Sequence, residues 1–209
     1  MDNGQRTTDD FQILIATGNA GKVSEMKELL ADLPFVLRNL KEFPKICEVE
    51  ETGSTFTENA ALKATGYAVQ TGLWTLADDS GLEVDALGGA PGVFSARYAG
   101  KNAGDAEKIA KLLGELGETS ARRARFVCAV ALADEAGDIK FQATGVCNGV
   151  IALTSSGVKG FGYDPIFVPD GFDQTFGELS GEVKQKISHR ARAMKKIIQY
   201  LRDFYSPCS

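Results

Sequence analysis

One apolar run ends in two adjacent acidic residues, and this junction constrains the fold more than any other stretch of the chain. Leu73–Ala77 is mostly apolar and is predicted to be a buried β-strand. We expect the strand to end at Asp78 and Asp79, before Ser80 and Gly81. Two neighbouring carboxylates repel each other and are costly to desolvate unless a cation joins them. The junction therefore predicts either a phosphate site with Mg²⁺, which prefers hard oxygen ligands, or an inert solvated turn.

Composition limits the classes of protein that the chain can represent. It has 209 residues, of which 44% are hydrophobic, enough for the core of one domain or one domain with a lobe. The net charge of -5 disfavours a general nucleic-acid binder, although a small anion can still bind where a site is locally positive. No apolar run approaches about 18 residues, so we expect no membrane span. Residues 1–10 are polar, and we expect a loose tail there, a single domain over residues 11–205 and a cytoplasmic protein.

The cysteines and the histidine exclude two kinds of site. No two of the cysteines form a C-x-x-C pair, so we expect reduced, mostly buried thiols instead of a disulfide framework or a zinc site. The cysteines are Cys47, Cys128, Cys147 and Cys208. Because the chain has one histidine, a multi-histidine metal centre within one chain is impossible.

A glycine-containing loop joins the first predicted strand, Phe11–Ala16, to the first predicted helix. In the loop Thr17–Lys22, glycines let the backbone approach an anion, helix N–H groups point toward it, and Lys22 adds positive charge. The loop is not a Walker P-loop, because Ala16 and Val23 stand where that motif needs glycine and a hydroxyl residue. The alternative is a plain turn whose glycines serve only its geometry.

An acidic segment precedes the next predicted helix. Glu48–Gly53, taken by itself, reads as a solvated loop. Thr55 and Glu58 form a predicted capping box, which opens a helix that ends at Gly72. Lys63 on this helix is either a surface lysine or a phosphate ligand, and spacing does not decide between them.

Two segments of the second half bear on function. Phe161–Phe167 combines aromatic rings with Asp164, which suits stacking on a nucleobase and accepting its N–H, or else an aromatic minicore under a turn. We expect one long helix after Ser180, whose basic start suits an anion or a carbonyl oxygen, although its histidine is by default solvated.

Residues 125–133 and 139–151 predict a β-hairpin. Arg122, with the arginines that follow it, predicts a solvated basic edge.

Together the motifs resemble those of the non-canonical purine nucleoside triphosphate pyrophosphatases, the inosine triphosphatase family. They occur in the family's order, and the resemblance extends from about Ile13 to Leu201. The matching segments are Thr17–Lys22, Phe56–Ala64, Ala77–Leu82, Pro91–Tyr98, Gly160–Phe167 and Ile187–Arg190.

The resemblance implies an elongated α/β fold, in which a long mixed sheet flanked by helices forms two lobes with a central cleft. It also implies a homodimer and a small-molecule nucleotide substrate. The implied reaction is Mg²⁺-dependent hydrolysis of ITP, dITP or XTP to the monophosphate and pyrophosphate, which clears deaminated purines from the nucleotide pool.

The resemblance further implies a role for each matching residue. Asp79 would accept a proton or bind the metal beside Asp78, and Glu51 would be a further Mg²⁺ ligand, with the adjacent Glu50 as the alternative. Phe161 would stack on the base, while Asp164 and the pair His189 and Arg190 would read its edge. The full set of implied substrate-binding residues is Thr17, Gly18, Asn19, Ala20, Gly21, Lys22, Lys63, Ser80, Phe161, Gly162, Tyr163, Asp164, Lys184, His189 and Arg190.

Three other functions remain open from the sequence. A related pyrophosphatase would act on modified pyrimidine or canonical nucleoside triphosphates, and the substrate profile separates it from the first reading. A nucleotide sensor would bind without turnover, but a pure binder has little need of adjacent carboxylates. A scaffold without a ligand would make the paired acids and the aromatic segment coincidences.

Overall fold

The computed structural model describes residues 11–205; the predicted tail at residues 1–10 and Cys208 lie outside the described residues. Six strands form one sheet in the order β2-β1-β3-β4-β5-β6. The sheet is mixed, because β1 runs parallel to β2 and β3 whereas β5 runs antiparallel to β6. The strands are β1 (Gln12–Ile15), β2 (Val36–Asn39), β3 (Trp74–Val84), β4 (Arg123–Ala133), β5 (Ile139–Ile151) and β6 (Phe167–Pro169).

Helices accompany this sheet, and the predicted class, α/β with a mixed sheet flanked by helices, is confirmed. The predicted hairpin is also confirmed, since β4 and β5 are neighbours joined by a short turn at residues 134–138. The α-helices are α1 (Ala20–Leu30), α2 (Phe56–Thr71), α3 (Asp105–Leu116), α4 (Gly181–Ile187) and α5 (His189–Tyr205). No helix within residues 11–205 is long and apolar enough to cross a membrane.

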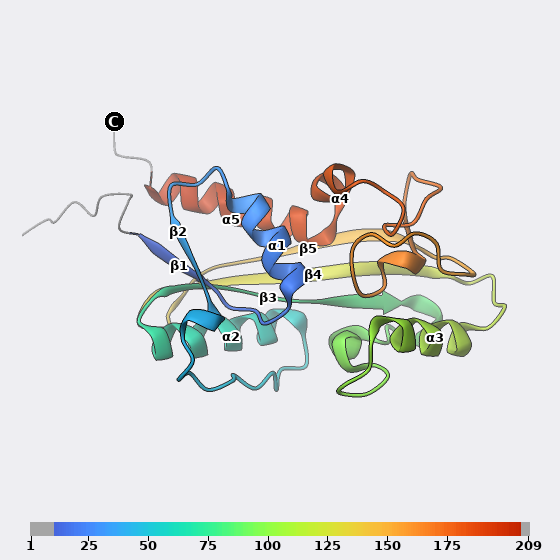
Figure 1. The fold of residues 1–209 in the computed structure, drawn as a ribbon, viewed down its shortest axis with the longest axis horizontal. Coiled ribbons are helices and arrows are strands. Elements are labelled where there is room, and N and C mark those ends of the chain that lie inside the picture. Colours follow the sequence, from blue (N-terminus) through green and yellow to red (C-terminus); the bar gives the residue numbers. More distant parts are fainter. Residues whose placement is uncertain (1–10, 206–209) are drawn as a thin grey trace, which may run out of the picture. The chain divides into compact units, whose positions relative to one another are not determined.

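The chain divides into two compact units, and the described part of unit 1 consists of residues 11–78, 129–143 and 194–205. Within unit 1, α2 lies on one face of the strands, while α1 and the end of α5 lie on the other (Figure 1). Both faces of β1 are therefore covered, and Ile13, Leu14 and Ile15 are fully buried. Helix α2 begins with the predicted capping box of Thr55 and Glu58 and ends at Gly72 in the left-handed conformation.

Unit 2 consists of residues 79–128 and 144–193 and has its own hydrophobic core. Helix α3 contributes side chains at helical spacing to this core, so its apolar stripe covers the strands of the unit. The core includes Leu82, Val84, Ile109, Leu112, Phe126, Ile166, Phe167 and Phe176.

Strand β3 does not end at the two acids, so the predicted end of the strand at Asp78 is wrong. The strand runs without interruption from Trp74 to Val84 and includes both acids. Its pairing with β1 ends at the Ile15–Leu76 partners, but its other neighbour is β4. The acids therefore stand on a strand that extends past the end of β1, where the chain leaves the sheet for the loop before α1.

The predicted last helix is two helices, α4 and α5, with a break at Ser188. Ser188 has an extended backbone (φ -65°, ψ 157°), and its hydroxyl accepts a hydrogen bond from the amide of Ala191. A serine in this position is a helix N-cap, so it starts α5 instead of continuing α4. The break places His189 and Arg190 in the first turn of a new helix.

The predicted solvated basic edge is wrong for Arg122. This side chain is 9% exposed, and its guanidinium donates to the carbonyl oxygens of Gly117, Ile151 and Ala152. It satisfies backbone acceptors that would otherwise be buried without a donor. Arg123 does lie at the surface, where it pairs with Asp170.

The prediction of reduced, mostly buried cysteines holds within residues 11–205. Cys128 and Cys147 are buried reduced thiols, and Cys47 is an exposed reduced thiol. Burial raises the pKa of the Cys147 thiol to about 11, so it is protonated and unreactive at neutral pH.

Candidate active site

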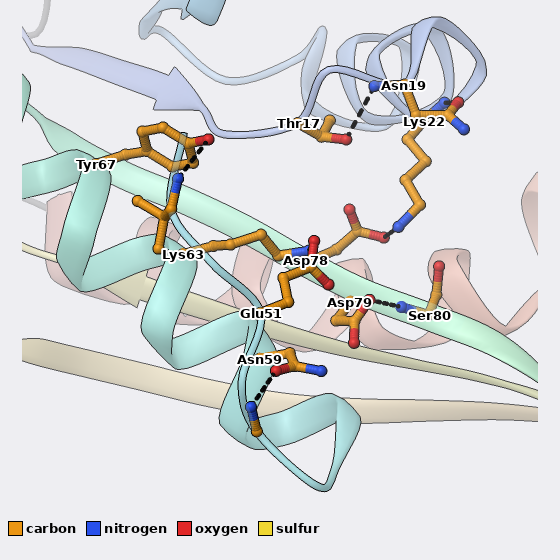
Figure 2. Close-up of polar contacts among 12 residues, drawn as sticks. Thr17, Asn19, Lys22, Glu51, Asn59, Lys63, Tyr67, Asp78, Asp79 and Ser80 are labelled. Carbon is orange, nitrogen blue, oxygen red and sulfur yellow. Dashed lines mark hydrogen bonds and ion pairs between the residues drawn. The ribbon is translucent and has the colours of Figure 1, made fainter. Parts of the chain in front are cut away.

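The loop after β1 in unit 1 forms the N-terminal cap of α1. Asn19 accepts a hydrogen bond from the amide of Lys22 through its Oδ1 atom (3.1 Å), and Thr17 Oγ1 accepts one from the amide of Asn19 (3.3 Å; Figure 2). Gly18 and Ala20 are exposed, and Gly21 is half-buried. The positive end of the α1 dipole therefore faces an accessible loop, which suits an anion.

Lys22 reaches from this loop to the first acid of β3. Its Nζ lies 3.1 Å from Asp78 Oδ2 (Figure 2), and the Asp78 side chain is fully buried. A buried carboxylate needs a compensating cation, and Lys22 is 14% exposed at its side chain. The pairing brings a predicted phosphate ligand and a predicted metal ligand together within unit 1.

The acidic segment before α2 is held against that helix instead of being a free solvated loop. The amide of Val49 donates to the Tyr67 hydroxyl (3.3 Å), and the amide of Gly53 donates to Asn59 Oδ1 (2.8 Å; Figure 2). Between these anchors, Glu51 Oε1 lies 3.1 Å from Lys63 Nζ. Lys63 is 8% exposed, so it is not an ordinary surface lysine.

Unit 1 therefore carries two pairs of opposite charges, each formed by an acid and a lysine that the sequence singled out. Within residues 11–205, no three His, Cys, Asp or Glu side chains are grouped closely enough to hold a metal ion. Glu51 and Asp78 each contact a lysine instead. Carboxylate oxygens are nevertheless the donor type that Mg²⁺ prefers, so the residues fit that ion by their chemistry.

The second acid of β3, Asp79, begins unit 2 and is 6% exposed. Its Oδ1 accepts a hydrogen bond from the amide of Ser80 (3.0 Å; Figure 2). The guanidinium of Arg190 donates to Ser80 Oγ (2.8 Å), and Arg190 is 1% exposed. The break before α5 thus places a buried arginine beside the strand that carries the acids.

The aromatic turn of unit 2 is organised around the buried carboxylate of Asp164. Its Oδ2 accepts hydrogen bonds from the amide of Phe161 (2.8 Å) and from Lys184 Nζ (2.5 Å). The Lys184 Nζ lies 4.8 Å from the centre of the Phe161 ring, and the Arg190 Cζ lies 5.8 Å from it. Gly162 has a positive φ of 62°, which helps turn the chain between Phe161 and Asp164. A half-buried ring beside two cations suits a planar, electron-rich ligand.

His189 and Tyr163 face the interior of unit 2. The ring of His189 stacks on Phe126 with centroids 4.7 Å apart, and it is 5% exposed, so the default of a solvated histidine is wrong. Tyr163 is buried in the core, and its hydroxyl donates to the backbone oxygen of Ser95 (3.0 Å). Burial raises the pKa of the Tyr163 phenol, so this donor stays protonated.

One residue that the sequence did not single out, Asp105, anchors the aromatic turn. The carboxylate lies at the start of α3, where its Oδ2 accepts a hydrogen bond from the amide of Gly162 (2.6 Å) and its Oδ1 pairs with Lys108 (2.6 Å). An acid in the first turn of a helix is too common to point to a contact 57 residues away. The sequence therefore held no signal for this role.

We expect Asp105→Asn to reduce the stability of the protein at neutral pH but not at low pH. Burial raises the pKa of Asp105, but the Lys108 ion pair and the Gly162 amide lower it by more, to below its ordinary 3.8. The carboxylate therefore stabilises the folded state above pH 3.8, and this contribution is lost as the pH falls through the lowered pKa. Urea unfolding of both proteins across this range measures the effect; a constant difference down to about pH 2 would contradict it.

Comparisons with known proteins agree on one family. The sequence model of the Ham1 family matches residues 13–200. A relative from Nostoc sp. called dITP/XTP pyrophosphatase is 50% identical over 186 residues, which are 89% of this chain and 92% of the relative. A relative of the same name from Desulforamulus reducens is 48% identical over 197 residues, with 93% and 98% covered. The solved structure of a HAM1 protein from Coxiella burnetii has a TM-score of 0.85 at 46% identity, with 92% of this chain and 99% of that chain covered.

Proposed function

The chain belongs to the Ham1 family, and we propose that it hydrolyses non-canonical purine nucleoside triphosphates (ITP, dITP or XTP) to the monophosphate and pyrophosphate. The family predicted from the motifs is thereby confirmed, and the chain is a nucleoside triphosphate pyrophosphatase. The printed name of the relatives, dITP/XTP pyrophosphatase, supports this class of substrate. The observation that carries the proposal is the pair of buried acids on β3, one beside Lys22 and the next beside Ser80.

We propose that the unit 1 residues bind the triphosphate. The loop from Thr17 to Lys22 offers the N-terminus of α1, and Lys22 and Lys63 supply positive charge. Both lysines contact acids, and a triphosphate can take the lysines' charge while the acids pair with a divalent cation. In this way neither the lysines nor the acids are left without an opposite charge.

Mg²⁺ is the proposed cofactor. Glu51, Asp78 and Asp79 would hold it together with phosphate oxygens of the substrate, because the acids of residues 11–205 are not grouped closely enough to hold an ion by themselves. The contact between Lys63 and Glu51, together with the exposed position of Glu50, favours Glu51 as the ligand. When bound, Mg²⁺ neutralises phosphate charge and lowers the pKa of a water molecule. The protein's own part is carried by Asp79, whose carboxylate orients a water toward the α-phosphorus and accepts its proton.

Removal of metal with EDTA is expected to abolish pyrophosphate release, and added Mg²⁺ is expected to restore it. Pyrophosphate release that persists in EDTA would contradict a metal cofactor.

We propose that the unit 2 residues bind the base. Phe161 stacks on the purine, and Asp164, His189 and Arg190 lie in the turn and the helix start that read its edge. The buried Lys184 holds Asp164 in place, and Gly162 and Tyr163 shape the turn. Ser80, whose hydroxyl accepts a hydrogen bond from Arg190, also touches the nucleotide.

Further parts of the proposal concern the whole protein. Residues 11–205 act as one pyrophosphatase domain, two copies form a homodimer, and the protein works in the cytoplasm without binding nucleic acid or a membrane. Reduced thiols at Cys47, Cys128 and Cys147 suit a reducing compartment. Light scattering of the purified protein tests the dimer, and a monomeric mass at micromolar concentration would overturn it.

A substrate panel tests the proposed function. Pyrophosphate release is measured from ITP, GTP, ATP and dTTP, each with Mg²⁺ and with EDTA. We expect rapid, metal-dependent release from ITP, with IMP as the co-product, and little release from the others. Equal activity on dTTP or ATP would favour the pyrimidine or canonical alternative, and tight ITP binding without turnover would favour a sensor.

A further inference from the structure

The part of β3 that carries Asp79 and Ser80 continues into a close contact with another segment of unit 2. The amide of Leu82 donates to Ser95 Oγ (2.9 Å), and Ser95 Oγ in turn donates to the backbone oxygen of Gly92 (2.6 Å). A Cβ atom added to Gly81 would lie 2.6 Å from that same Gly92 oxygen, closer than side chains approach backbone. Glycine inside a strand often marks such an approach, so β3 lies directly against the 3-10 helix at residues 92–97.

Ser95 also contacts the turn that carries the aromatic ring. The hydroxyl of Tyr163 donates to the backbone oxygen of Ser95 (3.0 Å), and both residues are buried, at 4% and 6% exposure. Tyr163 directly precedes Asp164, whose carboxylate fixes the amide of Phe161. Ser95 is therefore bonded through its side chain to the acid-bearing strand and through its carbonyl to the aromatic turn.

We propose that Ser95 is a positioning residue for the reaction. It holds the strand that carries Asp79 at a fixed position relative to the turn that carries Phe161. Asp79 is then correctly placed for the reaction when the base is bound at Phe161. The inference rests on the proposed function, because it concerns turnover of ITP. Serine suits the task since one hydroxyl accepts from Leu82 and donates to Gly92 at the same time.

A residue that positions the acid affects the chemical step more than substrate binding. Small displacements of a catalytic group lower turnover strongly, whereas the base and phosphate contacts that set affinity stay in place. We therefore expect Ser95→Ala to lower kcat for ITP by about tenfold or more, with KM within about twofold. Tyr163→Phe keeps the buried ring and removes one hydrogen bond, so it should lower kcat by about threefold to tenfold.

Thr75→Val is the matched control. Thr75 lies on the same strand, is fully buried and donates to the backbone oxygen of Leu73 (3.0 Å). The substitution removes a buried hydroxyl of similar burial but leaves the contact at Gly81 and Leu82 intact. We expect a comparable loss of thermal stability with kcat close to that of the original protein.

A second readout follows the contact without using activity. The amide of Leu82 is observed by NMR in the three variants, through its chemical shift and its rate of hydrogen exchange. We expect faster exchange of the Leu82 amide in Ser95→Ala. In Tyr163→Phe we expect a displaced Leu82 resonance, because the Tyr163 hydroxyl donates to the Ser95 carbonyl and the Leu82 amide donates to the Ser95 hydroxyl. Thr75→Val should leave both quantities unchanged.

The outcomes separate this inference from the proposed function. If the original protein hydrolyses ITP and both Ser95→Ala and Tyr163→Phe keep its kcat, the positioning role is overturned while the function stands. It is overturned equally if the kcat losses only match that of Thr75→Val. Should Ser95→Ala fail to fold, Tyr163→Phe decides. An original protein that releases no pyrophosphate from ITP, with the Leu82 amide responding as expected, would instead overturn the function.

Discussion

Replacing Asp79 by asparagine is expected to lower kcat for ITP by about a thousandfold or more while the fold is retained. Asparagine has nearly the same shape, so the contact with the amide of Ser80 can persist. It cannot accept a proton from water and adds no negative charge for a divalent cation. Pyrophosphate release at saturating ITP and Mg²⁺ measures the loss, and thermal unfolding checks the fold.

Glu83→Gln provides the control for this experiment. Glu83 lies on the same strand, four positions after Asp79, and pairs with Arg125 at the surface. Because an exposed ion pair contributes little stability, this variant should fold and turn over ITP like the original protein. A kcat of Asp79→Asn within a few-fold of that of Glu83→Gln would remove Asp79 from the mechanism.

Arg190→Ala is expected to reduce the preference for ITP over ATP by about a hundredfold or more. Hypoxanthine presents a 6-oxo acceptor, whereas adenine presents an amino donor at the same place. A buried guanidinium opposite that position satisfies the first and leaves the second unpaired, which costs several kcal/mol. The ratio of kcat/KM for the two substrates measures the preference.

Two further variants keep this experiment interpretable. Arg190→Met fills more of the buried volume than alanine and should lose the same preference with a smaller loss of stability. Arg192→Ala removes an exposed arginine two positions later, whose guanidinium donates to the backbone oxygen of Val146, and should keep the preference. An ITP to ATP ratio that stays the same in both Arg190 variants would refute the reading of the base by Arg190.

Patterns that depend on neighbouring residues were predictable from the sequence. The apolar run before Asp78, the capping box of Thr55 and Glu58 and the turn at residues 134–138 each have a local physical cause, and the structure confirms the elements that they predict. The motifs also predicted the family, because their order and spacing over most of the chain are specific.

Features that depend on distant partners were not predictable. Strand β3 continues through the acids since β4 lies beside it, and Arg122 is buried since carbonyls from residues 151 and 152 surround it. Spacing left Lys63 undecided, because its partner Glu51 is brought to it by contacts of residues 49 and 53 with α2. The helix break at Ser188 is a cap, and a serine within an amphipathic pattern carries no clear sign of one.

Hydrolysis of ITP in ¹⁸O-labelled water, with Mg²⁺ present, tests the central claim most directly. Attack of water on the α-phosphorus breaks the bond to the bridging oxygen, so the account predicts equal amounts of IMP and pyrophosphate, with one labelled oxygen in IMP and none in pyrophosphate. Mass spectrometry of the two products measures where the label lies. Label in pyrophosphate, or release of IDP with inorganic phosphate, would contradict the account.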